Sequence, residues 1–493
     1  MNKKTLGERV KNMIRNWLDI QPAEGQSISL KESMTFETEV MRSQIWYRGD
    51  ASEIRQFFRQ LQHYGVRSGF WESVPETENI TMKHSGLPAI IADVLAYIVV
   101  ADLDKLDCDR SEWKELTKPD IIDMPSLINN AIVDTLVDGD GAFKISLDES
   151  LTKYPIVEFI GADRVEYEQS RGITKAIVFK TVYEYKSKRY VLKEKYLKGR
   201  IESRLYDANG NEVSLDTLPM LDGINPILTF SGDYMMAVPL KFFVSKKHKG
   251  RGKSVFDGGR SDCFDALDEV ISEWWDALRA GRVTKYIPED MIPRDDVTGA
   301  LGKVNSFGTS FVTVASSLKE SGETAKIQIV QPDINYEAFV ESYSNALLMC
   351  LQGLVSPATL GIDIGKMSSA DAQREKKDVT GDTRNTITSK LEIALPQLIK
   401  AILWTYDNMR KKAPEDCGKI EVSFGEYGAP DFDSRVETVG KAATYGIMSI
   451  DTQIEELWGS SKDDAFKKAE AMRIKSEKGM IEGEPPSVGD ELA

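Results

Sequence analysis

Histidine and cysteine are scarce in this 493-residue chain. The three histidines are isolated from one another, which gives little support to a histidine-based metal site or to a Ser/Cys–His nucleophile. They are His63, His84 and His248. The four cysteines lie far apart without a CxxC pair, which argues against a zinc ribbon and a disulfide framework and fits a reducing cytoplasm. We therefore expect no catalytic residues, no metal and no cofactor.

Long apolar runs are also missing. The most apolar run, residues 87–100, is too short to cross a bilayer and contains Asp93. Residues 1–20 form a basic amphipathic pattern without the continuous apolar core of a signal peptide. Such a segment either lies on a membrane or packs on protein, and packing is the simpler interpretation. We expect no membrane association.

An excess of basic charge is absent as well. The 78 acidic residues outnumber the 63 basic ones, which gives a formal net charge of −15. Such a surface repels phosphate at long range and offers no broad basic face. The composition therefore excludes a conventional nucleic-acid-binding protein.

What is present is a long, mixed α+β pattern. Residues 30–135 show mostly helical spacing of apolar positions. Strand-like runs follow at 142–145, 156–160, 176–185, 190–198 and 202–206. The Asn-Gly pair at 209–210 predicts a hairpin after the last of these runs. The segments 138–141 and 207–212 each resemble part of a calcium loop but lack its register, so we interpret them as turns.

The second half of the chain alternates long helices with short inserts. From Gly258, helical spacing continues for about thirty residues to Pro288, which corresponds to a helix of roughly 45 Å. A small β-rich insert at 288–331 precedes a helical pattern at 336–354 and a Gly-, Ser- and Pro-rich loop at 355–369. A long helix over 370–412 should bend at Pro396. A short strand at 420–424 and two helical patterns follow, joined through Gly446 and an N-cap at Ser449 or Asp451.

Two motifs have both a functional and a plainer interpretation. The run Gly-Arg-Gly-Lys-Ser at 250–254 follows a possible strand at 242–245, as a phosphate-binding loop would, but position 247 is lysine where that motif needs glycine. It belongs either to a nucleotide site around Lys253 or to a basic linker. The apolar stripe that includes Trp274 and Trp275 is either a base-stacking platform or a packing face, and its helical spacing favours packing.

Short stretches in a shared order resemble the portal proteins of long-tailed bacteriophages. Residues 141–144 (Gly-Ala-Phe-Lys) and 155–164 resemble the family's body sheet. Residues 252–257, which run into 266–269, are similar to its entry into the first stem helix. The segments 356–361 and 369–375 resemble the surroundings of the tunnel loop, and the turn at 445–449 resembles the hairpin of the crown. The resemblance covers about residues 130 to 478 and is weakest before 130.

The resemblance implies a portal fold of class α+β with an α/β wing, a two-helix stem and a small β-rich clip, followed by a tunnel loop, a long bent helix and a helical crown. The implied boundaries are an N-terminal amphipathic segment at 1–29, the wing at 30–257, stem helices at 258–287 and 332–354, the clip at 288–331, the tunnel loop at 355–369, the long bent helix of the wing at 370–412, the crown at 413–478 and a disordered acidic tail at 479–493.

The resemblance also implies a ring of about twelve subunits at one capsid vertex of the virion, assembled in the bacterial host cytoplasm. Double-stranded DNA passes through such a ring during packaging and ejection. The implied partners are the terminase large subunit, which supplies the ATPase, the head–tail adaptor protein, and the major capsid and scaffolding proteins.

An acidic channel wall would let DNA slide, and a few basic residues would centre it. The DNA-facing candidates are Lys366, Ser368, Ser369, Arg279, Arg282 and Lys285. Arg279, Arg282 and Lys285 could equally form ion pairs between subunits. Two alternatives remain open, namely a structural scaffold without a ring that carries a helical-hairpin stalk, and a P-loop-like enzyme around Lys253.

Overall fold

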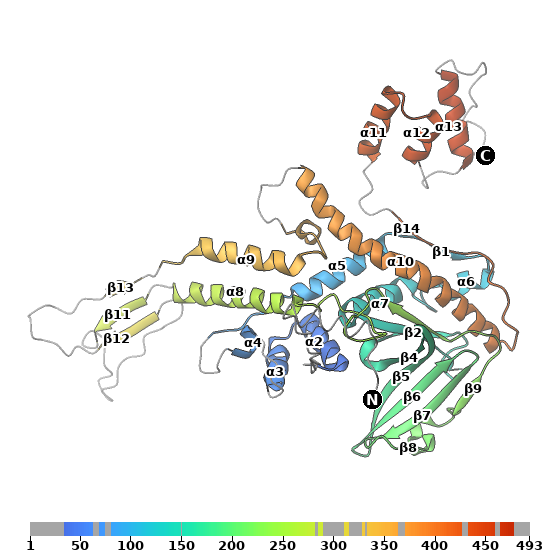
Figure 1. Ribbon diagram of the computed structural model, residues 1–493, viewed down its shortest axis with the longest axis horizontal. Coiled ribbons are helices and arrows are strands. Elements are labelled where there is room, and N and C mark those ends of the chain that lie inside the picture. Colours follow the sequence, from blue (N-terminus) through green and yellow to red (C-terminus); the bar gives the residue numbers. More distant parts are fainter. Residues whose placement is uncertain are drawn as a thin grey trace, which may run out of the picture. The chain divides into compact units, whose positions relative to one another are not determined.

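The computed structural model describes residues 34–62, 69–73, 80–148, 150–281, 284–288, 310–314, 328–330, 333–362, 370–425, 432–458 and 464–477 (Figure 1). The chain divides into two compact units. One comprises Met1–His84 and Asp268–Ile334, and the other comprises Ser85–Leu267 and Asn335–Ala493. The division falls inside helix α8 (Arg260–Ala280). Helices and strands both contribute extensively, so the expected α+β class is confirmed.

The first unit contains the helices α2 (Phe36–Arg48), α3 (Ala51–Gln62) and α4 (Phe70–Ser73) and the second half of α8. The hydroxyl of Thr35 caps α2 by accepting a hydrogen bond from the backbone N–H of Thr38. Aromatic side chains fill the core: Trp46 is buried against Phe58, with ring centroids 5.9 Å apart. The helical prediction for this part of the chain is confirmed.

A small three-stranded sheet belongs to the same unit. Strand β11 (Thr284–Pro288) lies between β12 (Ser310–Val314), which is parallel to it, and β13 (Gln328–Val330), which is antiparallel. The expected helix at 258–287 is therefore too long, because α8 ends at Ala280 and residues 284–288 form a strand. The β-branched residues that follow Gly281 favour a strand, and a glycine in itself weakens the helix.

The larger unit is built around two sheets. Strand β2 (Asp140–Ser146) lies between β10 (Ala237–Lys241) and β3 (Ile156–Gly161). Helix α7 (Met124–Asp138) packs on β2 and β3, and α5 (Leu87–Ala101) packs on α7. The expected strand at 242–245 is misplaced, because the chain forms β10 just before it, where Pro239 is tolerated at the sheet edge.

The second sheet is an antiparallel meander, in which β4 to β8 lie side by side (Figure 1). Its strands are β4 (Val165–Ser170), β5 (Ile173–Tyr185), β6 (Lys188–Leu197), β7 (Arg200–Asp207) and β8 (Glu212–Val213), and β9 (Ile227–Thr229) also pairs with β7. Leucines from β6, β7 and the following 3-10 turns η2 (Leu215–Thr217) and η3 (Pro219–Leu221) form a small core on it. The predicted Asn-Gly hairpin joins β7 to β8, and Gly210 adopts φ 81° there.

Two further helices of the larger unit carry the chain back to the body. Helix α9 (Tyr336–Leu351) is followed by the 3-10 turn η5 (Pro357–Leu360) and by α10 (Ala370–Met409), which continues through Pro396. Helix α10 packs on β10 and on β14 (Ile420–Phe424). Strand β14 pairs with β1 (Leu103–Cys108), and α6 (Ser111–Leu116) follows β1. The sequence did not predict β1.

The C-terminal part of the larger unit consists of α11 (Phe432–Thr444), α12 (Ile450–Trp458) and α13 (Asp464–Glu477), one helix more than expected. Gly446 adopts φ 68°, its N–H bonds to the Ala443 carbonyl, and the Ile447 N–H bonds to the Ala442 carbonyl. This pattern is a Schellman C-cap. Ser449 caps α12 by accepting from the Thr452 N–H at 3.2 Å, as one of the two predicted N-caps requires.

No helix in the described part of the chain is long and apolar enough to cross a membrane. The most apolar run of the sequence, residues 87–100, lies in α5, in which Ile91, Leu95 and Val99 are fully buried. The predicted amphipathic segment at 1–29 and the predicted tail at 479–493 lie outside the described residues.

Candidate functional site

The segment that resembles a phosphate-binding loop is tied to the body by one arginine. The guanidinium of Arg251 donates to both carboxylate oxygens of Asp140, at 3.0 and 2.8 Å. It also donates to the carbonyls of Val165 at 2.7 Å and Ala162 at 2.9 Å. Asp140 is fully buried, so this bidentate pair replaces the water that its charge would otherwise need.

The backbone of the same segment is already satisfied by protein. The N–H of Gly252 donates to Asp140 at 2.6 Å, that of Lys253 to the Phe243 carbonyl at 2.9 Å, and that of Val255 to the Leu136 carbonyl at 2.9 Å. A side chain at Gly252 would overlap the carbonyl of Gly139. A phosphate-binding loop instead directs free N–H groups at its ligand. The hypothesis of a nucleotide site around Lys253 is therefore wrong.

The second half of α8 presents apolar side chains to solvent. The predicted stripe is buried at Phe264 and Leu267, but Trp275 is 52% exposed and Leu278 is 41% exposed. The packing interpretation therefore fails, within this chain, for the distal part of the stripe. Arg279 is exposed beside it, and its guanidinium donates to the Thr81 hydroxyl at 2.6 Å.

A buried polar cluster within the first unit anchors α8 about two turns before Trp275, on nearly the same side of the helix. Asp268, which is fully buried, accepts from the indole N–H of Trp71 at 3.0 Å and contacts His84 Nδ1 at 2.7 Å. One turn later the hydroxyl of Ser272 donates to the Asp268 carbonyl and accepts from the Lys83 N–H. These contacts fix the rotation of the helix, so the exposure of its apolar face is set by the fold.

Helix α9 has buried residues only in its C-terminal part. Ala346, Leu347, Cys350 and Leu351 are buried, and Arg260 donates to the Cys350 carbonyl. Its exposed apolar side chains are Tyr336, Val340, Leu348 and Met349. Apolar residues that follow one another along a helix without a cover are typical of surfaces that pack on another chain.

The chain that leads out of α9 is held by threonines of α10. Thr380 Oγ1 accepts from the Ser356 N–H at 2.9 Å, and the Thr383 hydroxyl donates to the Leu354 carbonyl at 2.7 Å. Thr359 adds a hydroxyl contact to Thr380 at 3.0 Å. These bonds fix residues 354–359, the beginning of the loop expected at 355–369.

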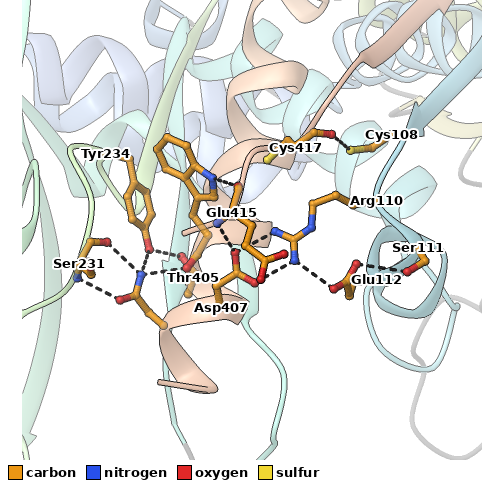
Figure 2. A network of polar contacts seen from close by, with 12 residues as sticks. Cys108, Arg110, Ser111, Glu112, Ser231, Tyr234, Thr405, Asp407, Glu415 and Cys417 are labelled. Atoms are coloured by element: carbon orange, nitrogen blue, oxygen red, sulfur yellow. Dashed lines mark hydrogen bonds and ion pairs between the residues drawn. The ribbon is translucent and has the colours of Figure 1, made fainter. Parts of the chain in front are cut away.

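A second polar network holds the other end of α10 (Figure 2). Arg110 donates to both carboxylate oxygens of Asp407, at 2.8 and 2.9 Å, and to Glu112 at 3.1 Å. These hydrogen bonds, the one to Asp407 foremost, raise the pKa of the Arg110 guanidinium above its ordinary value. Asp407 also accepts from the Glu415 N–H at 3.1 Å, which directs the chain toward β14.

The amide of Asn408 extends this network to the opposite side of α10. It accepts from the Ser231 N–H at 3.0 Å and donates to the Ser231 carbonyl and the Tyr234 hydroxyl, both at 3.1 Å. Tyr234 in turn lies 3.2 Å from the Thr405 hydroxyl. Burial raises the pKa of Tyr234, so the phenol stays neutral and serves as a hydrogen-bonding group. The network is structural rather than catalytic.

The described residues bring none of the predicted DNA-facing side chains together. Lys366, Ser368, Ser369 and Arg282 lie outside the described residues, and Lys285 is placed only by its backbone in β11. Arg279 alone has a described side chain. The described residues also contain no group of three or more His, Cys, Asp or Glu side chains that could hold a metal ion.

The buried arginine pairs were missed by the sequence reasoning. Arg251 was counted in a basic run, and Asp140 in a turn, although they lie 111 residues apart and bind each other. Arg110 and Asp407 are separated by 297 residues. No local pattern marks such pairs, because only the fold brings them together.

The order helix, small sheet, helix and long helix in the second half of the chain is the one expected for a phage portal protein, and that family consists of structural, non-enzymatic capsid components. Within that class, residues 261–484 match the family described as "Phage portal protein, SPP1 Gp6-like". The resemblance that the sequence suggested is thereby confirmed over this part of the chain.

Solved structures with some likeness come from gene transfer agent particles. "Virion of native gene transfer agent (GTA) particle" is 11% identical with a TM-score of 0.38 and covers 90% of this chain and 96% of that one. "Neck of empty GTA particle computed with C6 symmetry" is 13% identical with a TM-score of 0.38. "Neck of native GTA particle computed with C12 symmetry" is 12% identical with a TM-score of 0.37, and each neck likeness covers 76% of this chain and 89% of that one.

TM-scores this low do not establish a shared fold, so the assignment depends on the family match. None of the curated proteins matches the sequence.

Proposed function

We propose that this chain is the subunit of a portal ring of about twelve copies, which forms the DNA channel at one capsid vertex of a tailed phage or prophage particle. The observation that carries the proposal is the family match over residues 261–484, which includes α8, the small sheet, α9 and α10. The ring would conduct double-stranded DNA during packaging and ejection.

The proposed partition follows the order of the elements. Residues 30–257 and 370–412 form the wing, and α8 and α9 form the stem. The sheet β11–β13 belongs to the clip at 288–331, the loop at 355–369 is the tunnel loop, and the helices α11 to α13 belong to the crown at 413–478. The clip would dock first the terminase large subunit and then the head–tail adaptor, while the outer surface meets the major capsid and scaffolding proteins.

The open faces of α8 and α9 support a ring rather than an isolated chain. Trp275 on α8 and Met349 on α9, 60% exposed, would be costly to leave in water. In a closed ring each copy presents one face to one neighbour and a different face to the other, so these side chains would be covered by further copies of the same chain. A monomeric scaffold leaves them uncovered.

The charge of the chain supports a passive conduit. A net charge of −15 per subunit gives a ring that repels the phosphate backbone, so DNA is guided without being held tightly. Lys366, Ser368 and Ser369 of the tunnel loop, and Arg279, Arg282 and Lys285 around the end of the first stem helix, are the candidates for centring the duplex. The energy would come from the ATPase of the separate terminase.

Electron microscopy of the purified full-length chain, combined with light scattering after size-exclusion chromatography, tests the ring. We expect particles with a central hole and a mass of about twelve subunits. Trp275→Ser together with Met349→Ser should shift the mass toward monomer without a change in circular dichroism. Tyr97→Ser, which removes a still more exposed aromatic residue from α5, is the matched control and should leave the ring intact. A folded monomer of the unaltered chain would refute the ring and favour the scaffold.

A further inference from the structure

Two neighbouring cavities lie at the tip of the β4–β5 hairpin in the larger unit. One, of about 730 Å³, is lined by the end of β4 and by the loop before Arg251, including Tyr167, Gln169, Arg171 and Lys249. The other, of about 460 Å³, is lined by the start of β5 and by the β6–β7 turn, including Ile173 and Lys175. Gln169 joins the first two elements by donating to the Gly250 carbonyl at 3.4 Å.

Every charged residue that lines the two cavities is positive, although the chain as a whole is acidic. Arg171, Lys249 and Arg251 line the first cavity, and Lys175, Lys198 and Arg200 line the second. No aspartate or glutamate lines either one. In a chain with a net charge of −15, such a local reversal of sign marks a surface that is selective for an anionic partner.

Three of these six cationic side chains already form ion pairs within the chain, and three do not. Arg251 is paired with Asp140, Lys198 lies 3.0 Å from Asp233, and Arg200 lies 2.9 Å from Glu202. The remaining cations have no hydrogen bond or ion pair with any other described residue. They are Arg171, Lys175 and Lys249.

The backbone places one of the unpaired cations at a conformational cost. Ser170 pairs with Ile173, so Arg171 and Gly172 form a two-residue turn, with φ of 52° and 83°. Such a turn favours Asn or Gly at its first position, and a long side chain there costs roughly 1 kcal/mol. A residue that violates the local preference without a compensating contact in its own chain is typical of a functional position.

An apolar side chain accompanies the cations. Ile173, the residue after the turn, is 71% exposed and lines the second cavity. A DNA phosphate backbone offers no apolar surface that could pack on Ile173. An acidic polypeptide that also carries apolar residues can bury this side chain. The cavities are also concave and small, whereas a duplex is a convex rod that meets its partners over a wide basic surface.

We propose that the β4–β5 hairpin tip, together with residues 246–250, is a docking site for an acidic segment of a partner polypeptide. Carboxylates of the segment pair with Arg171, Lys175 and Lys249, and one of its apolar side chains packs on Ile173. The site does not depend on ring formation, so its test is independent of the proposed portal function.

Fluorescence anisotropy with the full-length protein tests the site. The probe is a short labelled peptide of alternating Glu and Ile, compared with the same peptide carrying Gln in place of Glu. We expect the Glu peptide to bind more tightly, and its binding to weaken about tenfold or more in Arg171→Asn combined with Lys249→Gln. Asn suits the turn better than Arg does, so this variant should be at least as stable as the parent, and a loss of binding is then not a loss of folding.

The sister hairpin supplies the control. Lys186 and Ser187 form the same kind of turn between β5 and β6, with φ of 50° and 58°, and Lys186→Asn should leave peptide binding unchanged. Four outcomes would overturn the proposal: equal binding of the Glu and Gln peptides, an equal loss of binding in Lys186→Asn, tighter binding of a short DNA duplex of matched charge, and a changed oligomer mass in the double variant. The third result would identify a DNA contact and the fourth a contact between copies.

Discussion

The guanidinium of Arg110 and the carboxylate of Asp407 form a two-point hydrogen-bonded pair across 297 residues of sequence. Both side chains are nearly buried, at 8% and 3% exposure. The pair joins the segment between β1 and α6 to the C-terminal end of α10. Since Asp407 also accepts from the Glu415 N–H, the same carboxylate positions the chain that enters β14.

We expect Asp407→Asn to lower the free energy of unfolding by about 3 kcal/mol, because it leaves the Arg110 charge buried without its anionic partner. Hydrogen exchange followed by mass spectrometry should show faster exchange at Glu415 and in β14. Glu421→Gln removes a carboxylate that pairs with Lys419 at the surface and is the matched control. It should change little. An equal loss in the two variants would mean that burial of the pair is not what makes it stabilising.

Gly252→Ala should destabilise the body by about 3 kcal/mol or more, because the added methyl group overlaps the Gly139 carbonyl. We expect a lower midpoint of thermal unfolding and poor soluble expression. Gly440→Ala in α11 has open space around the new methyl group and should be neutral or stabilising by up to about 1 kcal/mol. Lys253→Ala, at an exposed position, should leave stability unchanged and would affect it only if the lysine has a role that the described contacts do not include.

The thiol of Cys417 should resist alkylation in the folded protein. Burial, and to a lesser degree the neighbouring Cys108 thiol, raises its pKa to about 11. The Cys108 thiol also donates to the Cys417 carbonyl at 3.0 Å. Because only the thiolate reacts, iodoacetamide at pH 8 should label Cys417 at least about a hundredfold more slowly than it does in urea. Its rate should keep rising with pH toward 11.

Mass spectrometry of the labelled peptides provides this measurement, with the partly exposed Cys263 as the internal reference. Rapid labelling of Cys417 in the native protein would show that the β1–β14 edge opens far more often than its packing suggests.

Lys366→Ala should reduce the DNA retained in assembled particles while leaving the ring mass unchanged, since the proposed tunnel loop would lose its centring charge. Arg279→Ala should have a smaller effect, because its guanidinium already donates to the Thr81 hydroxyl. Quantification of packaged DNA in purified particles decides between these outcomes. Lys186→Ala, which removes a hairpin lysine from the body, is the control. Full packaging and retention in Lys366→Ala would remove this residue from the channel lining.

The sequence predicted elements whose signals are local. The strands that become β2, β3, β5, β6 and β7, the Asn-Gly hairpin and the Gly446 cap all follow from alternation or turn chemistry. The end of the first stem helix was misplaced because Pro288 is the first clear helix-breaking residue in the sequence, whereas α8 ends at Ala280 and residues 284–288 pair as a strand with segments distant in the chain.

The polar contacts that hold the body together could not be predicted in the same way. Asp140 and Arg251 each have an ordinary local interpretation, and their burial depends on strands that arrive from distant parts of the chain. The exposed face of α8 was also unpredictable, because apolar spacing looks the same whether the partner lies in the same chain or in another.

The pairing of β1 with β14 has a consequence for synthesis on the ribosome. Leu103 and Phe424 are partners in this ladder, so β1 must wait, unpaired along that edge, until most of the chain has been translated. An exposed strand edge is a template for pairing with other molecules, and nascent copies made close together on one messenger would meet it first. Keeping newly made chains apart, or covering that edge, would then govern how much soluble protein a cell obtains.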